Sequence, residues 1–296
     1  MKGFTLGKLE DYEEWRTATS GLYDQAGPDL RCYWVIDPCA SPDLPGILDA
    51  VKPGENRIPL FLNTYREAVA KAGPTLVPYI PGSDFNNWLF NLLETAPAGY
   101  LVQVARGEED GLYEHLQNLA ECTGPDGKRA MFRFFDPRIM YAVTTFPYPT
   151  AAEQLLGPVL RLDGWEHGRR SAISAGDGED HRYRCVAPIP YHQEFLDHIW
   201  KEVKIHTLIR FYAGSFAVSH PNAAYTDLYD DMETTYRFLE ANGFTDVESF
   251  NQAAVFTAAY PSCIWENRDV IEAFAALPEK TAFTEAIGAI GEGSHD

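Results

Sequence analysis

Short apolar runs alternate with amphipathic stretches over the first 187 residues, which predicts strands separated by helices. The expected strands are 31–36, 57–62, 75–80, 100–105 and 131–135, and the expected helices are 10–23, 42–51, 64–72, 84–93 and 108–122. Strands that alternate with helices favour βαβ units, so we expect an α/β lobe with a mostly parallel sheet.

The segment from residue 130 to 141 is the most informative part of this lobe. Residues 131–135 are expected to form a strand because apolar side chains surround a single arginine. Asp136 is placed to cap the next helix, and Pro137 to occupy its first turn, where a missing N–H costs nothing. This local pattern indicates a structural role rather than a catalytic one.

The pattern changes after residue 158. Short strands are expected at 159–162, 167–174 and 182–187, with a mobile loop at 176–180, and helices at 227–240, 245–259, 264–277 and 281–290. We therefore divide the chain into an α/β domain with a short β-rich tail, residues 1–187, and a small all-helical lobe, residues 188–296.

The charge balance restricts the possible partners. The 43 acidic residues against 24 basic ones give a net charge of −19, which repels nucleic-acid phosphates and anionic lipid headgroups. A basic protein segment fits this charge as a partner, and an acidic surface that only maintains solubility fits it equally well.

The cysteines and the apolar runs indicate the compartment. The five cysteines are Cys32, Cys39, Cys122, Cys185 and Cys263. Their odd number and scattered spacing favour reduced thiols over a disulfide framework. Residues 1–14 lack the apolar stretch of a secretory signal, and no run approaches the ~20 apolar residues that span a bilayer. We expect a cytoplasmic protein without membrane insertion.

Three carboxylates at expected strand ends are the strongest candidates for chemistry. In a parallel sheet, Asp37, Asp84 and Asp136 would converge and could hold Mg²⁺ for hydrolysis or phosphoryl transfer. Against this, Pro38 and Cys39 follow Asp37, so the Asp-x-Asp of aspartyl-nucleophile phosphatases is missing. Asp84 and Asp136 each have a sufficient role as helix caps. We expect no catalytic residue, metal or cofactor, and a metal-dependent enzyme stays the alternative.

Other catalytic motifs are missing from the sequence. His192, His198 and His206 do not have the spacing of a helical zinc pair. The sequence contains no H-E-x-x-H, no G-x-S-x-G and no P-loop. None of these patterns indicates an active site.

The helical lobe contains the candidates for partner binding. They are Phe211, Tyr212, Phe216, Asp227, Asp230 and Asp231. The apolar, glycine-interrupted stretch 211–220 suits a groove lining as well as a buried turn. The acidic residues occupy the first turns of an expected helix, where they either favour the helix dipole or form an acidic docking surface.

Several segments of the α/β domain occur together, in the same order, in one known family. Residues 131–139, Met-Phe-Arg-Phe-Phe-Asp-Pro-Arg-Ile, are close to its hallmark Phe-Arg-Phe-Tyr-Asp-Pro-Arg-Val, with Phe135 in place of the tyrosine. The supporting segments are Tyr-Trp-Val-Ile-Asp at 33–37, Gly-Pro-Thr-Leu-Val-Pro-Tyr at 73–79, Gly-Tyr-Leu-Val at 99–102 and His-Leu at 115–116. On these segments, residues 31–146 resemble the adaptor, or effector-chaperone, family of bacterial type VI secretion systems.

This resemblance implies a carrier without enzymatic activity. Such a protein binds a cognate toxic effector in the cytoplasm, helps to load it onto the secretion spike protein, and is not itself secreted. The matching residues Asp37, Arg133, Asp136, Pro137 and Arg138 are expected to specify the fold, with Arg133 or Arg138 paired to Asp37 or another carboxylate. A structural subunit of a larger assembly is a third possibility. The sequence does not indicate the effector, the surface that binds it or the spike, or the oligomeric state.

Overall fold

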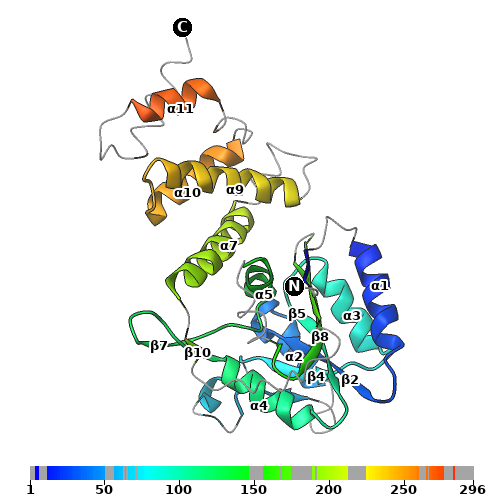
Figure 1. Cartoon of the computed structure of the whole chain (residues 1–296). Coiled ribbons are helices and arrows are strands. Elements are labelled where there is room, and N and C mark those ends of the chain that lie inside the picture. Colours follow the sequence, from blue (N-terminus) through cyan, green and yellow to red (C-terminus); the bar gives the residue numbers. More distant parts are fainter. Residues whose placement is uncertain are drawn as a thin grey trace. The chain divides into compact units, whose positions relative to one another are not determined.

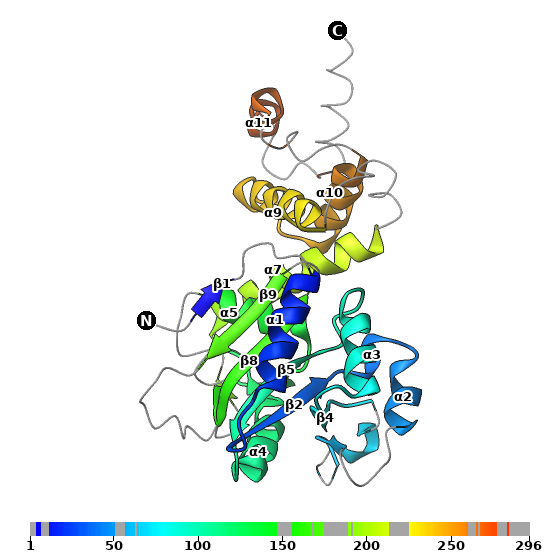
Figure 2. The same cartoon turned by 90° about the vertical axis from the view of Figure 1, so that its right-hand side faces the viewer.

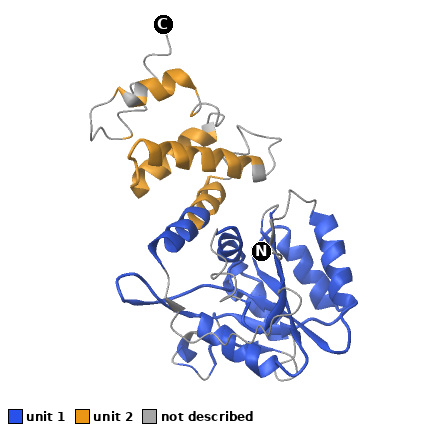
Figure 3. Ribbon diagram, viewed as in Figure 1, with its two compact units in different colours: residues 1–202 blue, residues 203–296 orange. Residues whose placement is uncertain are grey.

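The computed structural model describes two compact units. The described residues are 4–6, 12–50, 57–62, 64, 66–70, 72–146, 156–166, 169–174, 189–190, 192–212, 225–259, 265, 267–276 and 283. Unit 1 spans residues 1–202 and unit 2 spans residues 203–296, so the boundary falls within helix α7 (Gln193–Phe211) (Figure 3). The expected domains, 1–187 and 188–296, stay a prediction, because compact units do not by themselves show which segment folds independently.

Unit 1 is built on a seven-stranded sheet in the order β1-β9-β8-β5-β2-β4-β3. The strands are β1 (Phe4–Leu6), β2 (Leu30–Ile36), β3 (Ile58–Pro59), β4 (Thr75–Pro78), β5 (Gly99–Ala105), β8 (Val159–Glu166) and β9 (Arg169–Ser174). Every neighbouring pair in this sheet runs antiparallel (Figure 2). The expected mostly parallel sheet is therefore wrong.

The position of β2 explains why the parallel prediction is wrong. β4 and β5 both run antiparallel to β2, one on each side of it. They are therefore parallel to each other, and helix α3 (Asp84–Leu93) joins them as in a βαβ unit. A strand–helix–strand pattern predicts this crossover, but it does not reveal that an earlier strand lies between the two parallel ones.

Helices cover the sheet of unit 1. They are α1 (Tyr12–Asp24), α2 (Leu44–Ala50), α3, α4 (Glu109–Leu119) and α5 (Pro137–Thr145), with the 3₁₀ helices η1 (Pro38–Ala40) and η2 (Glu67–Val69). Helices α1, α2 and α3 pack on one face, where Trp15, Trp34 and Leu89 belong to one buried cluster. Helix α5 packs against β8 and β9, and α4 packs against β5 (Figure 2).

A second sheet of three strands places β6 between β10 and β7 (Figure 1). Its strands are β6 (Glu121–Thr123), β7 (Arg129–Met131) and β10 (Ile189–Pro190). The strand expected at 131–135 is wrong, because β7 ends at Met131 and an irregular loop follows. Phe134 and Phe135 are adjacent in this loop and both are buried. A half-buried strand points neighbouring side chains to opposite faces, so it could not bury both.

Other expected elements of unit 1 have different bounds. The strand at 57–62 is reduced to β3, and the helix at 64–72 to the 3₁₀ helix η2. The helix at 108–122 ends at Leu119, after which the chain continues as β6. The expected loop at 176–180 and strand at 182–187 lie outside the described residues, as does most of the helix expected at 281–290 in unit 2.

Unit 2 is helical in its described part. It contains the end of α7, α9 (Tyr225–Ala241), α10 (Val247–Ala259) and α11 (Arg268–Ala275). Trp265 belongs to its core, with its ring 4.9 Å from that of Phe238. The indole N–H of Trp265 donates to Thr257 Oγ1 (3.0 Å), whose hydroxyl lies 2.9 Å from that of Thr235. In the described part of the chain, no helix has an apolar stretch long enough to cross a membrane.

Candidate functional site

The end of β2 positions the first residue of the family-like motif. Asp37 follows this central strand directly and is buried, with 4% of the residue exposed. The backbone N–H of Cys39 donates to Asp37 Oδ1 (3.0 Å), which makes Asp37 the cap of η1. Pro38 occupies the first position of this short helix. Local capping therefore fixes one carboxylate oxygen and leaves the other for a partner from elsewhere in the chain.

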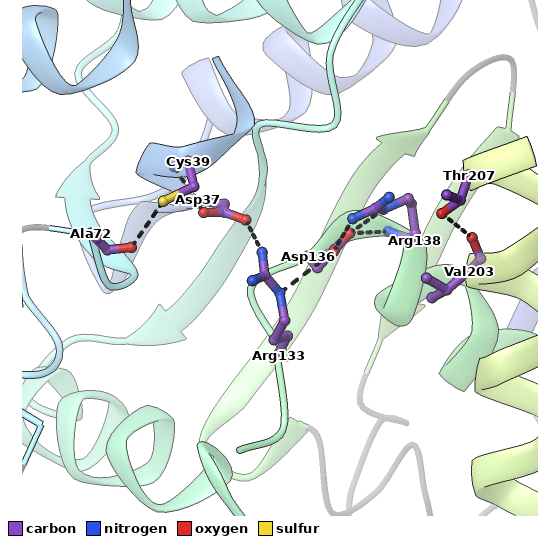
Figure 4. A network of polar contacts seen from close by, with 8 residues as sticks. All are labelled: Asp37, Cys39, Ala72, Arg133, Asp136, Arg138, Val203 and Thr207. Carbon is purple, nitrogen blue, oxygen red and sulfur yellow. Dashed lines mark hydrogen bonds and ion pairs between the residues drawn. The ribbon is translucent and has the colours of Figure 1, made fainter. Parts of the chain in front are cut away.

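Arg133 is the partner of that second oxygen. Its Nη2 atom donates to Asp37 Oδ2 (2.8 Å), and its Nε atom lies 3.8 Å from Asp136 Oδ2 (Figure 4). The guanidinium lies over the Phe135 ring, 5.1 Å from its centroid. The Arg133 side chain is 42% exposed. One partly exposed arginine thus bridges two buried carboxylates that come from different elements.

Asp136 begins α5 and fixes a second arginine. It accepts a hydrogen bond from the backbone N–H of Arg138 (3.1 Å) as the helix cap, and Pro137 occupies the first turn, as the sequence predicts. The Arg138 guanidinium donates to both Asp136 oxygens, at 2.9 Å from Nε and 2.6 Å from Nη2. Such a two-point pair holds both side chains in one geometry.

The four charges alternate in sign along one connected set, which we call the motif network: Asp37, Arg133, Asp136 and Arg138. Burial raises the pKa of the Asp37 carboxyl, while the Cys39 N–H and the Arg133 charge act in the opposite direction. Hydrogen bonding to Asp136 raises the pKa of Arg138 despite its burial. The network joins the end of β2 to the start of α5, so its geometry is suited to holding two elements together.

The structure does not bring together the three carboxylates of the metal hypothesis. Asp84 is exposed in the first turn of α3, and it is not the cap, because Ser83 Oγ accepts from the Asn86 N–H (3.2 Å). Asp37 and Asp136 already bind guanidinium groups. Among the residues that the structure describes, no group of three or more His, Cys, Asp or Glu side chains could hold a metal ion.

The segment that contains the motif network can be compared with known protein families. Residues 32–151 match the family described as Domain of unknown function (DUF4123). No curated protein and no solved structure matches the chain. The DUF4123 segment contains the whole motif network, together with β4, β5 and all but the first two residues of β2. It ends before β8 and β9, which complete the same sheet on the other side of β5.

A second charged network, outside the DUF4123 segment, was not predicted from the sequence. Asp163 on β8 is fully buried and binds Arg161 Nε (2.5 Å), Arg161 Nη2 (2.8 Å) and the Tyr23 hydroxyl (3.1 Å). Burial, and next the Asp163 charge, raise the pKa of Tyr23. The spacing of Arg161 and Asp163 places both on one face of a strand, but no local signal connects them to a tyrosine 140 residues away.

The expected partner-binding residues lie in several environments. At the end of α7, Phe211 is 79% exposed, and its ring lies 5.0 Å from that of Tyr212, which packs against the core of unit 2. On α9, Asp227 and Asp230 are exposed and Asp231 is half-buried. Phe216 lies outside the described residues. The role of these residues in partner binding stays a prediction.

Proposed function

We propose that this protein is a cytoplasmic adaptor of a bacterial type VI secretion system, which binds a cognate effector and helps to load it onto the spike protein. The match of residues 32–151 to DUF4123, a domain associated with type VI effector adaptors, is the observation that carries this proposal. The hallmark-like residues 131–139 lie inside the matching segment. The spike protein as a second partner is the finer part of the proposal.

In this proposal the protein acts only by binding other proteins. It uses no catalytic residue, no metal and no cofactor. The geometry of the motif network supports this view, because its carboxylates bind arginines of the same chain. Carboxylates that act as metal ligands or general bases need a free oxygen directed at the ligand or substrate. Asp37 and Asp136 instead connect β2 to α5.

The net negative charge of the protein suits an effector whose contact surface is cationic. Acidic residues exceed basic ones in both units, and the net negative charge per residue is larger in residues 203–296 than in residues 1–202. Opposite charges accelerate encounter between partners, and salt weakens this effect. We therefore place the first contact with the effector on unit 2, near the exposed carboxylates of α9.

A pulldown from the native bacterium tests the proposed function. The tagged protein is recovered from cells that express the secretion system, in low and in moderate salt, and the eluate is identified by mass spectrometry. We expect one large effector, with or without the spike protein, and less of it in moderate salt. A clean monomer with no partner would contradict the adaptor function.

Charge reversals locate the effector surface in the same experiment. Lysine at Asp227 and Asp230 should reduce recovery of the effector without unfolding the protein. The matched control places lysine at Glu13 and Glu14, two acidic residues in the first turn of α1 in unit 1. Equal recovery by both double variants would contradict a docking surface on unit 2.

A further inference from the structure

The β6–β7 hairpin is an exposed arm of unit 1. All residues from 125 to 131 are exposed, so β7 is covered on neither face. Figure 1 shows the hairpin reaching away from the large sheet, with β7 as the outer strand. Among the other edge strands of the two sheets, β3 and β10 each have two residues, one of which is a proline, and β1 has three residues and no proline. A proline removes a hydrogen-bond donor from the edge of a sheet. Strand β7 contains no proline, so its edge keeps all its backbone donors.

The pairing of β6 with β7 determines which backbone groups of β7 face outward. The N–H of Gly124 donates to the carbonyl of Lys128 (3.0 Å), and the N–H of Phe132 donates to the carbonyl of Ala120 (3.1 Å). Hydrogen-bonded pairs occur at every second position of an antiparallel ladder. Between these two pairs, Ala130 therefore bonds toward β6, while the N–H and C=O groups of Arg129 and Met131 point to the open edge.

The side chains of β7 define the chemistry of a strand that could pair there. Arg129 and Met131 lie on the same face of the strand, because they are two residues apart. The Arg129 side chain is 73% exposed and lies 3.9 Å from Glu121, and the preceding residue, Lys128, is 84% exposed and pairs with Asp126. The cation of each pair is exposed, and pairs with an exposed cation contribute little to stability, so both cations can pair with a partner's carboxylates.

We propose that the outer edge of β7 pairs with an extended segment of the effector. This inference rests on the proposed function. The segment continues the sheet through the two outward N–H and two outward C=O groups of Arg129 and Met131, as in other cases of strand addition. It places a carboxylate beside Arg129 and an apolar side chain beside Met131, because neighbouring strands pair side chains directly across from each other.

Two variants at one position distinguish the contribution of the backbone to effector binding from that of the side chain. Met131→Pro removes an outward N–H and leaves the bonds of Ala130 to β6 intact, whereas Met131→Ala keeps the N–H. The probe is the purified effector identified in the pulldown, titrated into each variant by calorimetry. We expect roughly tenfold weaker binding for Met131→Pro, the effect of one backbone hydrogen bond left unmade in an interface, and a smaller change for Met131→Ala.

Hydrogen exchange of the wild-type protein gives a second test that needs no variant. The amides of Arg129 and Met131 should exchange quickly in the free protein and slowly in the complex with the effector. Unchanged exchange at these amides, or equal binding by Met131→Pro and wild type, would overturn the edge pairing while leaving the adaptor function in place. A wild-type dimer that Met131→Pro converts to a monomer would show that a second copy of the chain occupies the edge, which also overturns the proposal. Failure of the wild-type protein to recover any effector would overturn both.

Discussion

Arg133 Nη2 lies 2.8 Å from Asp37 Oδ2, which joins two segments that are 96 residues apart in the chain. The segment before α5 has no regular structure, although it contains the buried Phe134 and Phe135. Its conformation is fixed by burial of these rings and by Arg133, which holds the loop to the end of β2. The hallmark-like sequence is thus explained by the fold it stabilises.

The two partners of this ion pair should respond differently to substitution. Asp37 is 4% exposed, whereas the Arg133 side chain is 42% exposed. Arg133→Gln leaves a buried carboxylate with a weaker partner and should lower the free energy of unfolding by about 2 kcal/mol at pH 7. Asp37→Asn leaves a solvated arginine and should cost less than about 1 kcal/mol. Urea unfolding of both variants measures the difference, and a larger loss in Asp37→Asn would contradict this account.

Acidification should partly restore the stability that the Arg133→Gln variant loses at pH 7. Burial raises the pKa of Asp37 above its ordinary value of 3.8. A carboxyl with a raised pKa in the folded state contributes stability that is fully present below 3.8 and is lost as the pH rises through the folded-state pKa. The deficit of Arg133→Gln relative to Asp37→Asn should therefore shrink as the pH falls from 7 toward 3.8. A deficit independent of pH would show that the charge of Asp37 is not its cause.

Asp136→Ala should be among the most destabilising single substitutions in unit 1. It removes the cap of α5 and leaves Arg138, 20% exposed, without its two-point partner. We expect a loss of about 3 kcal/mol, since a lost cap costs about 1 kcal/mol and an unpaired, partly buried charge costs more. Asp84→Ala is the control, with a change within about 0.5 kcal/mol, because Ser83 caps α3. Equal losses in thermal or urea unfolding would contradict these different roles.

Gly99 begins β5 where the chain passes close to β2. A Cβ atom at this position would collide with the backbone carbonyl oxygen of Val35, which cannot rotate away. Gly99→Ala should cost roughly 2 kcal/mol or more by overpacking. The control Gly46→Ala, in α2 with open space around it, should be neutral or stabilise by up to about 1 kcal/mol. Similar melting temperatures for the two variants would contradict the close packing of β5 on β2.

The ionisation of Asp246 should make the stability of unit 2 depend on pH. It accepts hydrogen bonds from the Ser249 N–H (2.9 Å) and Oγ (2.5 Å) just before α10, and these bonds lower its pKa below 3.8. A lowered pKa contributes stability that is present above 3.8 and is lost as the pH falls through the folded-state value. Asp246→Asn should therefore be less stable than wild type at pH 7, by about 1 kcal/mol or less because the site is exposed. This gap should close in acid, and a constant gap in unfolding measured against pH would exclude this cause.

Local signals in the sequence predicted the elements whose causes are local. Apolar spacing and flanking Gly or Pro residues located α1, α3, β2 and β5 within a few residues. The Asp136-Pro137 step correctly predicted the cap and first turn of α5. At α3 the same logic selected Asp84 instead of Ser83, because adjacent Ser and Asp residues both suit a cap and only the backbone geometry decides between them.

Long-range relationships could not be predicted in this way. The placement of β2 between β4 and β5 depends on the packing of the whole sheet, and no periodicity in the sequence encodes it. The apolar residues 131–135 fit a strand by composition, but burial of adjacent rings favours an irregular loop. The resemblance allowed either Arg133 or Arg138 to pair with Asp37, and only the three-dimensional structure assigns Arg133 to it.

Secretion of the effector from a strain that lacks this protein tests the central claim most directly. The effector is the protein recovered in the pulldown, and a second, unrelated protein secreted by the same apparatus is measured alongside it. An adaptor predicts that secretion of the cognate effector is lost, that the second protein is secreted normally, and that the wild-type gene restores the effector. Loss of both proteins would indicate a structural subunit, and normal secretion of both would contradict the adaptor function.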